Sequence, residues 1–334
     1  MSLLTVNNLE VRFALRQGDV IALRDINFSL QRGERLGVVG ESGAGKSVLG
    51  FSVLNLIARP GYIAQGEVAF EGNNLAALPA EAMRSIRGNR IAMIFQDPMM
   101  TLNPVLTIGE QMTECLQAHR KIRLEDARKI ALHRLKQVHI PSPEHRLEQY
   151  PHELSGGMRQ RIVIAIALLL DPDLIIADEP TTALDVTIQA EIMSLMLELC
   201  ESNNVALMLI THDLGVVSEI TRQTMVMYAG RIVEIGPTRE IINDAQHPYT
   251  QGLINALPQM AVPGKRLNQI RGSMPSLQHV PSGCAFRPRC DYAVPVCEQQ
   301  VPDLHASGGC RVACHLMSEK NPVLLNGHAE EPQP

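Results

Sequence analysis

Residues 40–47 read GESGAGKS and follow directly on the apolar stretch RLGVV at residues 35–39. This pattern predicts a phosphate-binding loop between a strand and a helix, and that placement disfavours a chance glycine-rich turn. Glycines let backbone N–H groups turn toward phosphates, and the helix that begins near Gly45 adds the positive end of its dipole. We expect Lys46 to reach the β- and γ-phosphates and Ser47 to bind Mg²⁺. The residues expected to line the nucleotide here are Gly40, Glu41, Ser42, Gly43, Ala44, Gly45, Lys46, Ser47 and Val48.

Two carboxylates follow a second apolar stretch, LIIADE at residues 174–179. A buried parallel strand would hold Asp178 at its carboxyl end, where ligands bind in open α/β sheets. We expect Asp178 to hold Mg²⁺, mainly through water, and Glu179 to orient and polarise the attacking water. Such acidic pairs are more often surface charges, but their position downstream of a phosphate loop favours the catalytic interpretation.

Two further segments carry polar groups at the ends of regular elements. LSGGM, at residues 154–158, places Ser155, Gly156 and Gly157 before a long helical pattern, which predicts a second helix N-terminus with exposed amides. One subunit already has its own phosphate loop, so the second cradle would serve a nucleotide held by another subunit. THD, at residues 211–213, ends the strand pattern ALMLI, so His212 is expected to reach the γ-phosphate.

The surrounding patterns predict an α/β protein. The first 70 residues contain alternating stretches typical of antiparallel strands, whereas residues 35–39, 91–95, 174–178 and 206–211 are apolar strands of a parallel sheet covered by helices. Residues 108–154 are mainly helical. Proline, glycine and cysteine become frequent from about residue 245, which predicts a separate C-terminal extension.

Composition excludes several classes of protein. The 334 residues are 45% hydrophobic with a net charge of −5, so nothing indicates a general nucleic-acid binder. The apolar runs are shorter than the ~20 residues that span a bilayer, so a membrane role would come through a partner.

Residues 1 to about 240 resemble the nucleotide-binding subunit of an ABC transporter. Walker A, Q-loop, signature, Walker B, D-loop and switch histidine occur in the family's order, with Met158 in place of the commonest glutamine. The resemblance implies a P-loop ATPase fold with domains at 1–240 and 241–325 and a helical subdomain inserted at about 99–158. The terminal segment NGHAEEPQP, at residues 326–334, predicts a disordered tail. It implies catalytic roles for Glu179, His212, Lys46 and Gln96, Mg²⁺ binding at Ser47, Gln96 and Asp178, and nucleotide contacts at Ser155, Gly156, Gly157 and Asp185. Phe13 is the candidate that would stack on adenine, with strand core as the alternative.

Two segments narrow the resemblance to the ATPases of oligopeptide, dipeptide and nickel importers: FQDPMMTLNPVLTIGEQ at residues 95–111 and HPYTQGLINALP at residues 247–258. This implies ATP-driven import of di- or oligopeptides at the cytoplasmic face of the inner membrane. The implied partners are two permease subunits, a second, related but non-identical ATPase, and an extracytoplasmic solute-binding protein. Nickel, glutathione or opine-like cargo stays open. A soluble ABC ATPase of translation or DNA repair, or a decayed regulatory module, is a weaker alternative.

Five of the seven cysteines lie between residues 284 and 314. Disulfides are disfavoured because they are rare in the cytosol. A zinc site usually has paired cysteines two to four residues apart, and only Cys310 and Cys314 approach that spacing. Buried free cysteines are the third explanation, but the segment has too many cysteines for simple core filling. A segment rich in proline and glycine buries little apolar surface and needs a staple. We therefore expect a [4Fe–4S] cluster, as the family resemblance also implies, with zinc as the alternative. The expected ligands are Cys284, Cys290, Cys297 and Cys314, with Cys310 as the spare thiol.

Overall fold

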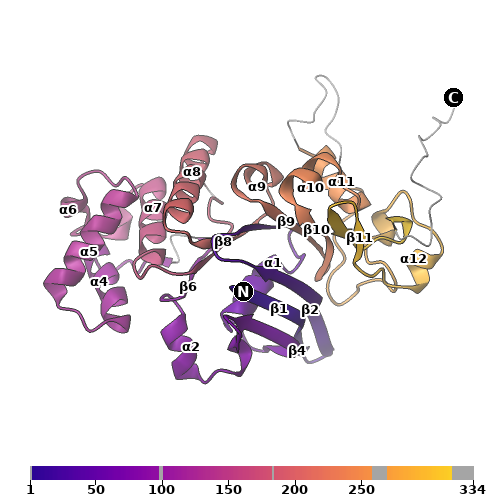
Figure 1. The fold of residues 1–334 in the computed structure, drawn as a ribbon, viewed down its shortest axis with the longest axis horizontal. Coiled ribbons are helices and arrows are strands. Elements are labelled where there is room, and N and C mark those ends of the chain that lie inside the picture. The colour runs from indigo at the N-terminus through magenta and orange to yellow at the C-terminus, as the bar shows by residue number, and fades with distance from the viewer. Residues whose placement is uncertain (1, 98–100, 183, 258–268, 318–334) are drawn as a thin grey trace.

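The computed structural model describes residues 2–97, 101–182, 184–257 and 269–317. The tail predicted at 326–334 lies outside these ranges, as do residues 99 and 100 at the start of the predicted helical subdomain. Within them the chain forms two sheets with helices around the larger one, as Figure 1 shows. The predicted α/β architecture with an antiparallel N-terminal part is confirmed.

The smaller sheet is antiparallel, with strand order β2-β1-β4-β5. Alternating burial along β1 and β2 puts apolar side chains on the face that covers the main sheet, as period-two patterning requires. Its strands are β1 (Leu4–Leu15), β2 (Gly18–Leu30), β4 (Gly61–Phe70) and β5 (Asn73–Asn74).

The larger sheet has the order β11-β12-β10-β9-β3-β8-β7-β6. The strands from β9 to β6 are parallel, and the remaining three add to one edge in antiparallel pairing. The four predicted parallel strands are present; β9 and β10 were not predicted. Its strands are β3 (Arg35–Val39), β6 (Ile91–Ile94), β7 (Leu174–Asp178), β8 (Ala206–Thr211), β9 (Gln223–Tyr228), β10 (Arg231–Pro237), β11 (His305–Ser307) and β12 (Cys310–Val312).

Helices cover the main sheet and build the two ends of the molecule, with α4–α6 and α12 at opposite ends in Figure 1. The described α-helices are α1 (Lys46–Val53), α2 (Ala80–Ile86), α4 (Ile108–His119), α5 (Leu124–Gln137), α6 (Pro143–Arg146), α7 (Gly156–Ala167), α8 (Val186–Ser202), α9 (Leu214–Ile220), α10 (Thr238–Asn243), α11 (Pro248–Asn255) and α12 (Val296–Gln299). Short 3₁₀ helices are η1 (Leu75–Ala77), η2 (Pro151–Glu153), η4 (Arg287–Arg289) and η5 (His315–Met317). None of these described helices is long and apolar enough to cross a membrane.

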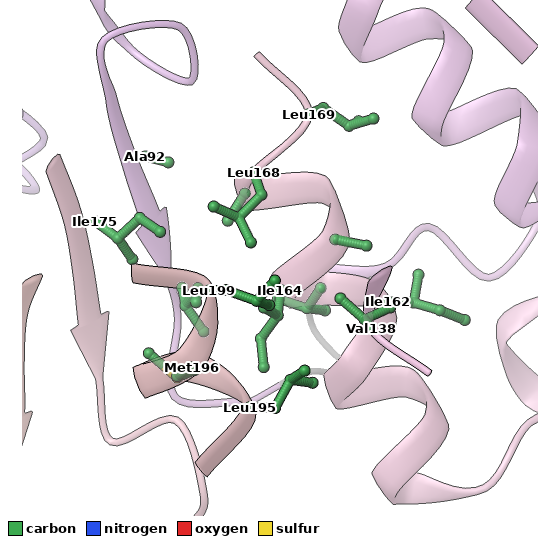
Figure 2. Close-up of a cluster of buried hydrophobic side chains, with 14 of the residues drawn as sticks. Ala92, Val138, Ile162, Ile164, Leu168, Leu169, Ile175, Leu195, Met196 and Leu199 are labelled. Atoms are coloured by element: carbon green, nitrogen blue, oxygen red, sulfur yellow. The ribbon is translucent and has the colours of Figure 1, made fainter. Parts of the chain in front are cut away.

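Helix α7 joins the inserted helices to the main sheet through a buried apolar cluster, drawn in Figure 2. Ile164 of α7 and its C-cap residue Leu168 pack in one cluster with Leu199 of α8 and Ile175 of β7. Because such interiors are close-packed, the direction of α7 is fixed relative to the sheet. The N-terminus of α7, which carries the signature residues, is therefore held in a defined place.

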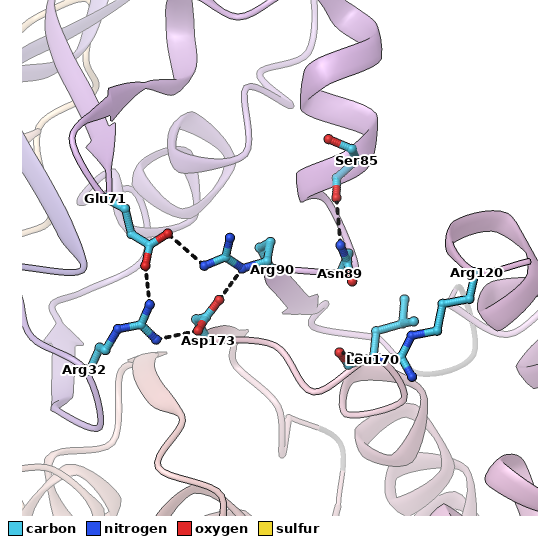
Figure 3. A network of polar contacts seen from close by, with 8 residues as sticks. All are labelled: Arg32, Glu71, Ser85, Asn89, Arg90, Arg120, Leu170 and Asp173. Atoms are coloured by element: carbon cyan, nitrogen blue, oxygen red, sulfur yellow. Dashed lines mark hydrogen bonds and ion pairs between the residues drawn. The ribbon is translucent and has the colours of Figure 1, made fainter.

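A ring of ion pairs ties the two sheets together at their surface, as Figure 3 shows. Arg32 and Arg90 each pair with both Glu71, which follows β4, and Asp173, which precedes β7. The hydrogen bond from Arg90 is the main reason that the pKa of Glu71 lies below its ordinary value. Each carboxylate is thus shared between two guanidinium groups from segments far apart in the sequence.

The C-terminal region, used here for the described residues from 241 onward, joins the main sheet rather than standing apart from it. Strand β12 pairs with β10, and β11 pairs with β12. Tyr228 of β9, Tyr249 of α11 and Phe286 form an aromatic cluster, with ring centroids 4.7 to 5.4 Å apart. The region and the sheet therefore share one hydrophobic cluster.

Candidate functional site

The phosphate loop leaves the carboxyl end of β3 and closes on α1. Gly40, Gly43 and Gly45 have φ of 154°, 84° and 99°, a range that L side chains rarely adopt, and Gly45 is the N-cap of α1. A Cβ on Gly40 would also lie 2.4 Å from the carbonyl oxygen of Met227. The strand–loop–helix arrangement predicted from residues 35–47 is confirmed.

Lys46 points into this loop and is only 6% exposed. Its ammonium donates to the carbonyl oxygens of Gly40, at 2.7 Å, and Glu41, at 3.0 Å. Burial lowers the pKa of Lys46, and the carboxylates of Glu179 and Asp178 oppose that shift. The charged amine is therefore held by the loop's own carbonyls, at the centre of the predicted phosphate site.

Ser47 and Asp178 meet at the end of the sheet, where the Ser47 hydroxyl donates to Asp178 Oδ1 at 3.0 Å. Burial raises the pKa of Asp178, although the bond from Ser47 opposes the shift. A cavity of about 510 Å³ opens beside them, with Gln96 also in its lining. Hydroxyl, carboxylate and amide oxygens are donors that suit Mg²⁺, so these three predicted ligands fit that ion chemically.

Glu179 has an unusual backbone, with φ of 46°, and its N–H donates to Ile210 O at 2.8 Å. Non-glycine residues in this region store strain, which clusters at functional sites. Its carboxylate accepts from Thr182 Oγ1 at 2.9 Å and from Gln96 Nε2 at 3.3 Å, and it lies 3.3 Å from His212 Nδ1. The structure therefore brings Gln96, Glu179 and His212 together. Thr182 was not predicted; its place three residues after Glu179 was the available signal.

The signature segment forms the start of α7, with one difference from the prediction. The helix begins at Gly156, so both glycines lie in its first turn rather than before it. Ser155 is the N-cap and accepts from Met158 N at 3.3 Å. Ser155 and Gly156 are exposed, whereas a Cβ on Gly157 would lie 3.0 Å from Ile188 of α8. The residues at the N-terminus of α7 are therefore accessible in the single chain.

Two predicted nucleotide residues have structural partners of their own. Asp185 caps α8 by accepting from Ile188 N at 3.0 Å. Phe13 packs against the N-terminal core cluster, and its ring edge would lie 2.7 Å from a Cβ on Gly61. These contacts are those of a strand core residue, and adenine stacking by Phe13 stays a prediction.

The cysteines of the C-terminal region fall into two environments. Burial is the main reason that the pKa of Cys314 rises to about 11, and the thiols of Cys284, Cys290 and Cys297 contribute to the same rise. Cys310 instead lies 3.8 Å from Glu240, and burial with nearby carboxylates raises its pKa to about 12. Among the described residues, however, no three histidine, cysteine or acidic side chains are grouped so as to hold a metal ion.

His247, at the start of α11, anchors the C-terminal region and is 2% exposed. Its Nδ1 accepts from Tyr249 N at 3.0 Å. Burial lowers the pKa of His247 to about 3, although a hydrogen bond to the Ala313 backbone opposes this shift. The unfolded chain thus binds a proton near pH 6.5 that the folded chain takes up only near pH 3. The stabilisation by neutral His247 is complete above pH 6.5 and is lost as the pH falls toward 3.

Replacing His247 with asparagine is expected to flatten the acid side of the stability profile. Asparagine can still cap α11 but cannot titrate. Between about pH 6 and 4 the parent chain should lose up to ~1.4 kcal/mol per pH unit more unfolding free energy than the variant. Urea unfolding across this range measures the difference, with the exposed His305→Asn as the matched control. Parallel profiles for parent and His247→Asn would contradict the assignment.

Comparison with known proteins places these features in a family. Residues 23–182 match the ABC transporter family, and residues 233–297 match the oligopeptide/dipeptide transporter C-terminal region. The chain is 48% identical over 314 residues to a putative peptide import ATP-binding protein of Brucella melitensis, covering 90% of this chain and 93% of that one. It is 45% identical to the dipeptide transport ATP-binding protein DppD of Haemophilus influenzae, covering 98% of this chain and all of that one.

Solved structures agree with the fold. The dimeric ATP-binding cassette MJ0796 bound to ADP and Pi matches 71% of this chain and 99% of its own length, with a TM-score of 0.64 and 28% identity. The cassette cbiO1 of Clostridium perfringens matches 73% of this chain and 91% of its own, with a TM-score of 0.63 and 26% identity. With a strand–loop–helix phosphate site, an acidic strand end and both family segments present, the chain belongs to the ATP-hydrolysing subunits of the ABC transporter family.

Proposed function

We propose that this chain hydrolyses ATP to power the import of di- or oligopeptides. The observation that carries the cargo assignment is the match of residues 233–297 to the oligopeptide/dipeptide transporter C-terminal region, because the ATPase fold alone serves many solutes. The relatives named above are peptide import and dipeptide transport ATP-binding proteins, and this chain matches them along nearly their whole length. Nickel, glutathione or opine-like solutes are the alternatives, since the ATPase subunit does not contact the cargo.

The proposed assembly follows from that role. This chain would lie at the cytoplasmic face of the inner membrane, bound to two permease subunits and to a second, related ATPase, with an extracytoplasmic solute-binding protein delivering the cargo. Cells that lack this chain should fail to take up a radiolabelled dipeptide, and a plasmid copy should restore uptake. Loss of nickel uptake with normal peptide uptake would move the assignment to the alternative cargo.

In the proposed site, each residue acts on one part of the nucleotide. Lys46 and the loop amides neutralise and orient the phosphates, and Ser47, Asp178 and Gln96 would hold Mg²⁺, which supplies charge neutralisation at the transferring phosphoryl group. Glu179 orients the attacking water, while Gln96 and His212 position Glu179 and the γ-phosphate. Positioning and charge stabilisation would provide most of the rate, because phosphoryl transfer leaves little covalent work to the protein.

The signature is proposed to act on the nucleotide of a partner ATPase. Ser155 and Gly156 are exposed in the single chain, and their first-turn amides have the polarity that binds phosphate. The likeness to a cassette that is dimeric with ADP and Pi supports two chains meeting around the nucleotide. Each closed site would then combine one chain's phosphate loop with the other's signature.

We also propose that Cys284, Cys290, Cys297 and Cys314 hold a [4Fe–4S] cluster, with zinc as the alternative. Thiolates are the ligands that such clusters use. Support comes from the pKa of Cys314, which burial and the thiols of Cys284, Cys290 and Cys297 raise, whereas the pKa of Cys310 is raised by burial and by carboxylates. No closed ligand group is present among the described residues, so binding would have to draw the thiols together.

Anaerobic purification tests this proposal. The protein should be brown, absorb at about 400 nm and carry about four iron atoms per chain. Cys314→Ser should lose the iron, whereas the matched Cys310→Ser should retain it. A colourless protein with one zinc per chain would favour zinc, and a protein without either metal would refute both. If Cys310→Ser lost the iron and Cys314→Ser kept it, Cys310 rather than Cys314 would be the fourth ligand.

A further inference from the structure

Glu41, the second residue of the phosphate loop, is bound through three of its groups at once. Its N–H donates to the Tyr249 hydroxyl at 2.8 Å. Its carboxylate accepts from both terminal nitrogens of Arg289, at 2.6 and 3.0 Å. Its carbonyl accepts from Lys46 at 3.0 Å. Glu41 thus connects the phosphate-binding lysine directly to two side chains of the C-terminal region.

Arg289 is fixed before it reaches Glu41. Its side chain is 5% exposed, and its Nε donates to the backbone carbonyl of Arg271 at 2.7 Å. The guanidinium carbon also lies 5.8 Å from the centre of the Tyr228 ring and 5.9 Å from that of Phe286. Because these contacts already hold the Arg289 side chain in place, little side-chain entropy is lost when it pairs with Glu41. This bidentate pair is therefore stronger than an ion pair between mobile surface side chains.

The pair also balances charge beside the phosphate site. The Glu41 side chain is 32% exposed and belongs to the loop that must receive the phosphates of ATP. Without a compensating cation, this carboxylate would repel the polyphosphate, and partial burial would strengthen the repulsion relative to bulk water. Arg289 supplies the compensating charge from outside the loop, which leaves Lys46 available for the nucleotide.

From this geometry we infer that Arg289 and Tyr249 are positioning residues for the phosphate loop, through which the C-terminal region sets the affinity for ATP. The inference rests on the proposed ATP site, but it assigns a task to a region that lies outside residues 23–182, which match the ABC transporter family. Because Arg289 directly precedes Cys290, the cysteine-rich segment and the nucleotide loop share one anchor. A displacement of this segment would therefore reach Glu41 directly.

A charge-matched mutant cycle on the full chain tests the inference, with MgATP binding measured by calorimetry. Arg289→Gln should weaken ATP binding about tenfold, equivalent to ~1.4 kcal/mol. In a Glu41→Gln background the same arginine substitution should weaken binding less than about twofold, because the uncompensated carboxylate is gone. Arg271→Gln is the matched control: its side chain is 82% exposed, pairs with Asp291 and does not contact Glu41.

Thermal unfolding of each variant shows whether the chain still folds, so that a loss of ATP affinity in a folded variant can be assigned to the position of the phosphate loop. Tyr249→Phe removes only the hydroxyl that accepts the Glu41 N–H, and should weaken ATP binding about threefold, within the modest range of one hydrogen bond. Unchanged ATP affinity in Arg289→Gln would overturn the inference. The inference would also be overturned if Arg289→Gln weakened ATP binding equally in the parent and in the Glu41→Gln chain, since that result would mean that the substitution destabilises the protein in general. Failure of the parent chain to bind ATP would instead refute the proposed ATP site.

Discussion

Replacing Glu179 with glutamine is expected to lower ATP hydrolysis by about 100-fold or more while ATP binding persists. The amide keeps the shape of the side chain, so Thr182 and Gln96 can still contact it. It removes the charge that orients and polarises the attacking water. The bound nucleotide should then hold two ATPase chains together as a closed dimer.

Steady-state ATPase assays and size-exclusion chromatography with ATP measure the two effects. The second nucleotide site has to be inactivated, because its turnover would mask the loss. Glu198→Gln, an exposed glutamate of α8, is the matched control and should keep the parent rate. Unchanged hydrolysis in Glu179→Gln would exclude Glu179 from the reaction.

The second large effect is expected from Ser155→Arg. The substitution puts a bulky side chain at the outward-facing start of α7, where the phosphates of the partner's nucleotide would dock. In the Glu179→Gln chain it should abolish the ATP-dependent dimer, and in the assembled transporter it should lower hydrolysis at the site it completes by about 100-fold.

The control for this variant is Ser85→Arg, on the exposed side of α2, which should leave the ATP-dependent dimer intact. Size-exclusion chromatography of the two double variants with ATP gives the comparison. A Glu179→Gln/Ser155→Arg chain that still dimerised on ATP would contradict a signature acting across the interface.

Much of the site follows from short stretches of sequence because its geometry is local. The glycines at 40, 43 and 45 specify the backbone of the phosphate loop, and an apolar run ending in Asp178 specifies a buried strand with its carboxylate at the tip. Parallel strands that end at one edge of a sheet bring such groups together without further information. The family resemblance had implied roles for Gln96, Glu179 and His212 at one site, and the folded chain places their side chains together. Thr182 was marked only by its place three residues after Glu179.

Other predictions failed or stayed open where packing decides. Strands β9 and β10 are buried and pair antiparallel, but their patterns are not distinct from those of buried helical segments of similar length. The signature glycines lie within α7 because Ser155 caps the helix, so α7 begins at Gly156 rather than after the LSGGM segment. Phe13 has an aromatic ring in the right part of the chain, yet its surroundings are those of the N-terminal core.

By itself, the sequence determined the phosphate loop, the acidic strand end and the family to which the chain belongs, because these depend on residues that are neighbours along the chain. Only the tertiary structure decided that Tyr249 and Arg289, 208 and 248 residues from Glu41, converge on it, and that Cys310 faces Glu240 away from the other thiols. These contacts arise when β12 pairs with β10 and the aromatic cluster closes. Pairing and packing between distant segments leave no periodic trace in either segment alone.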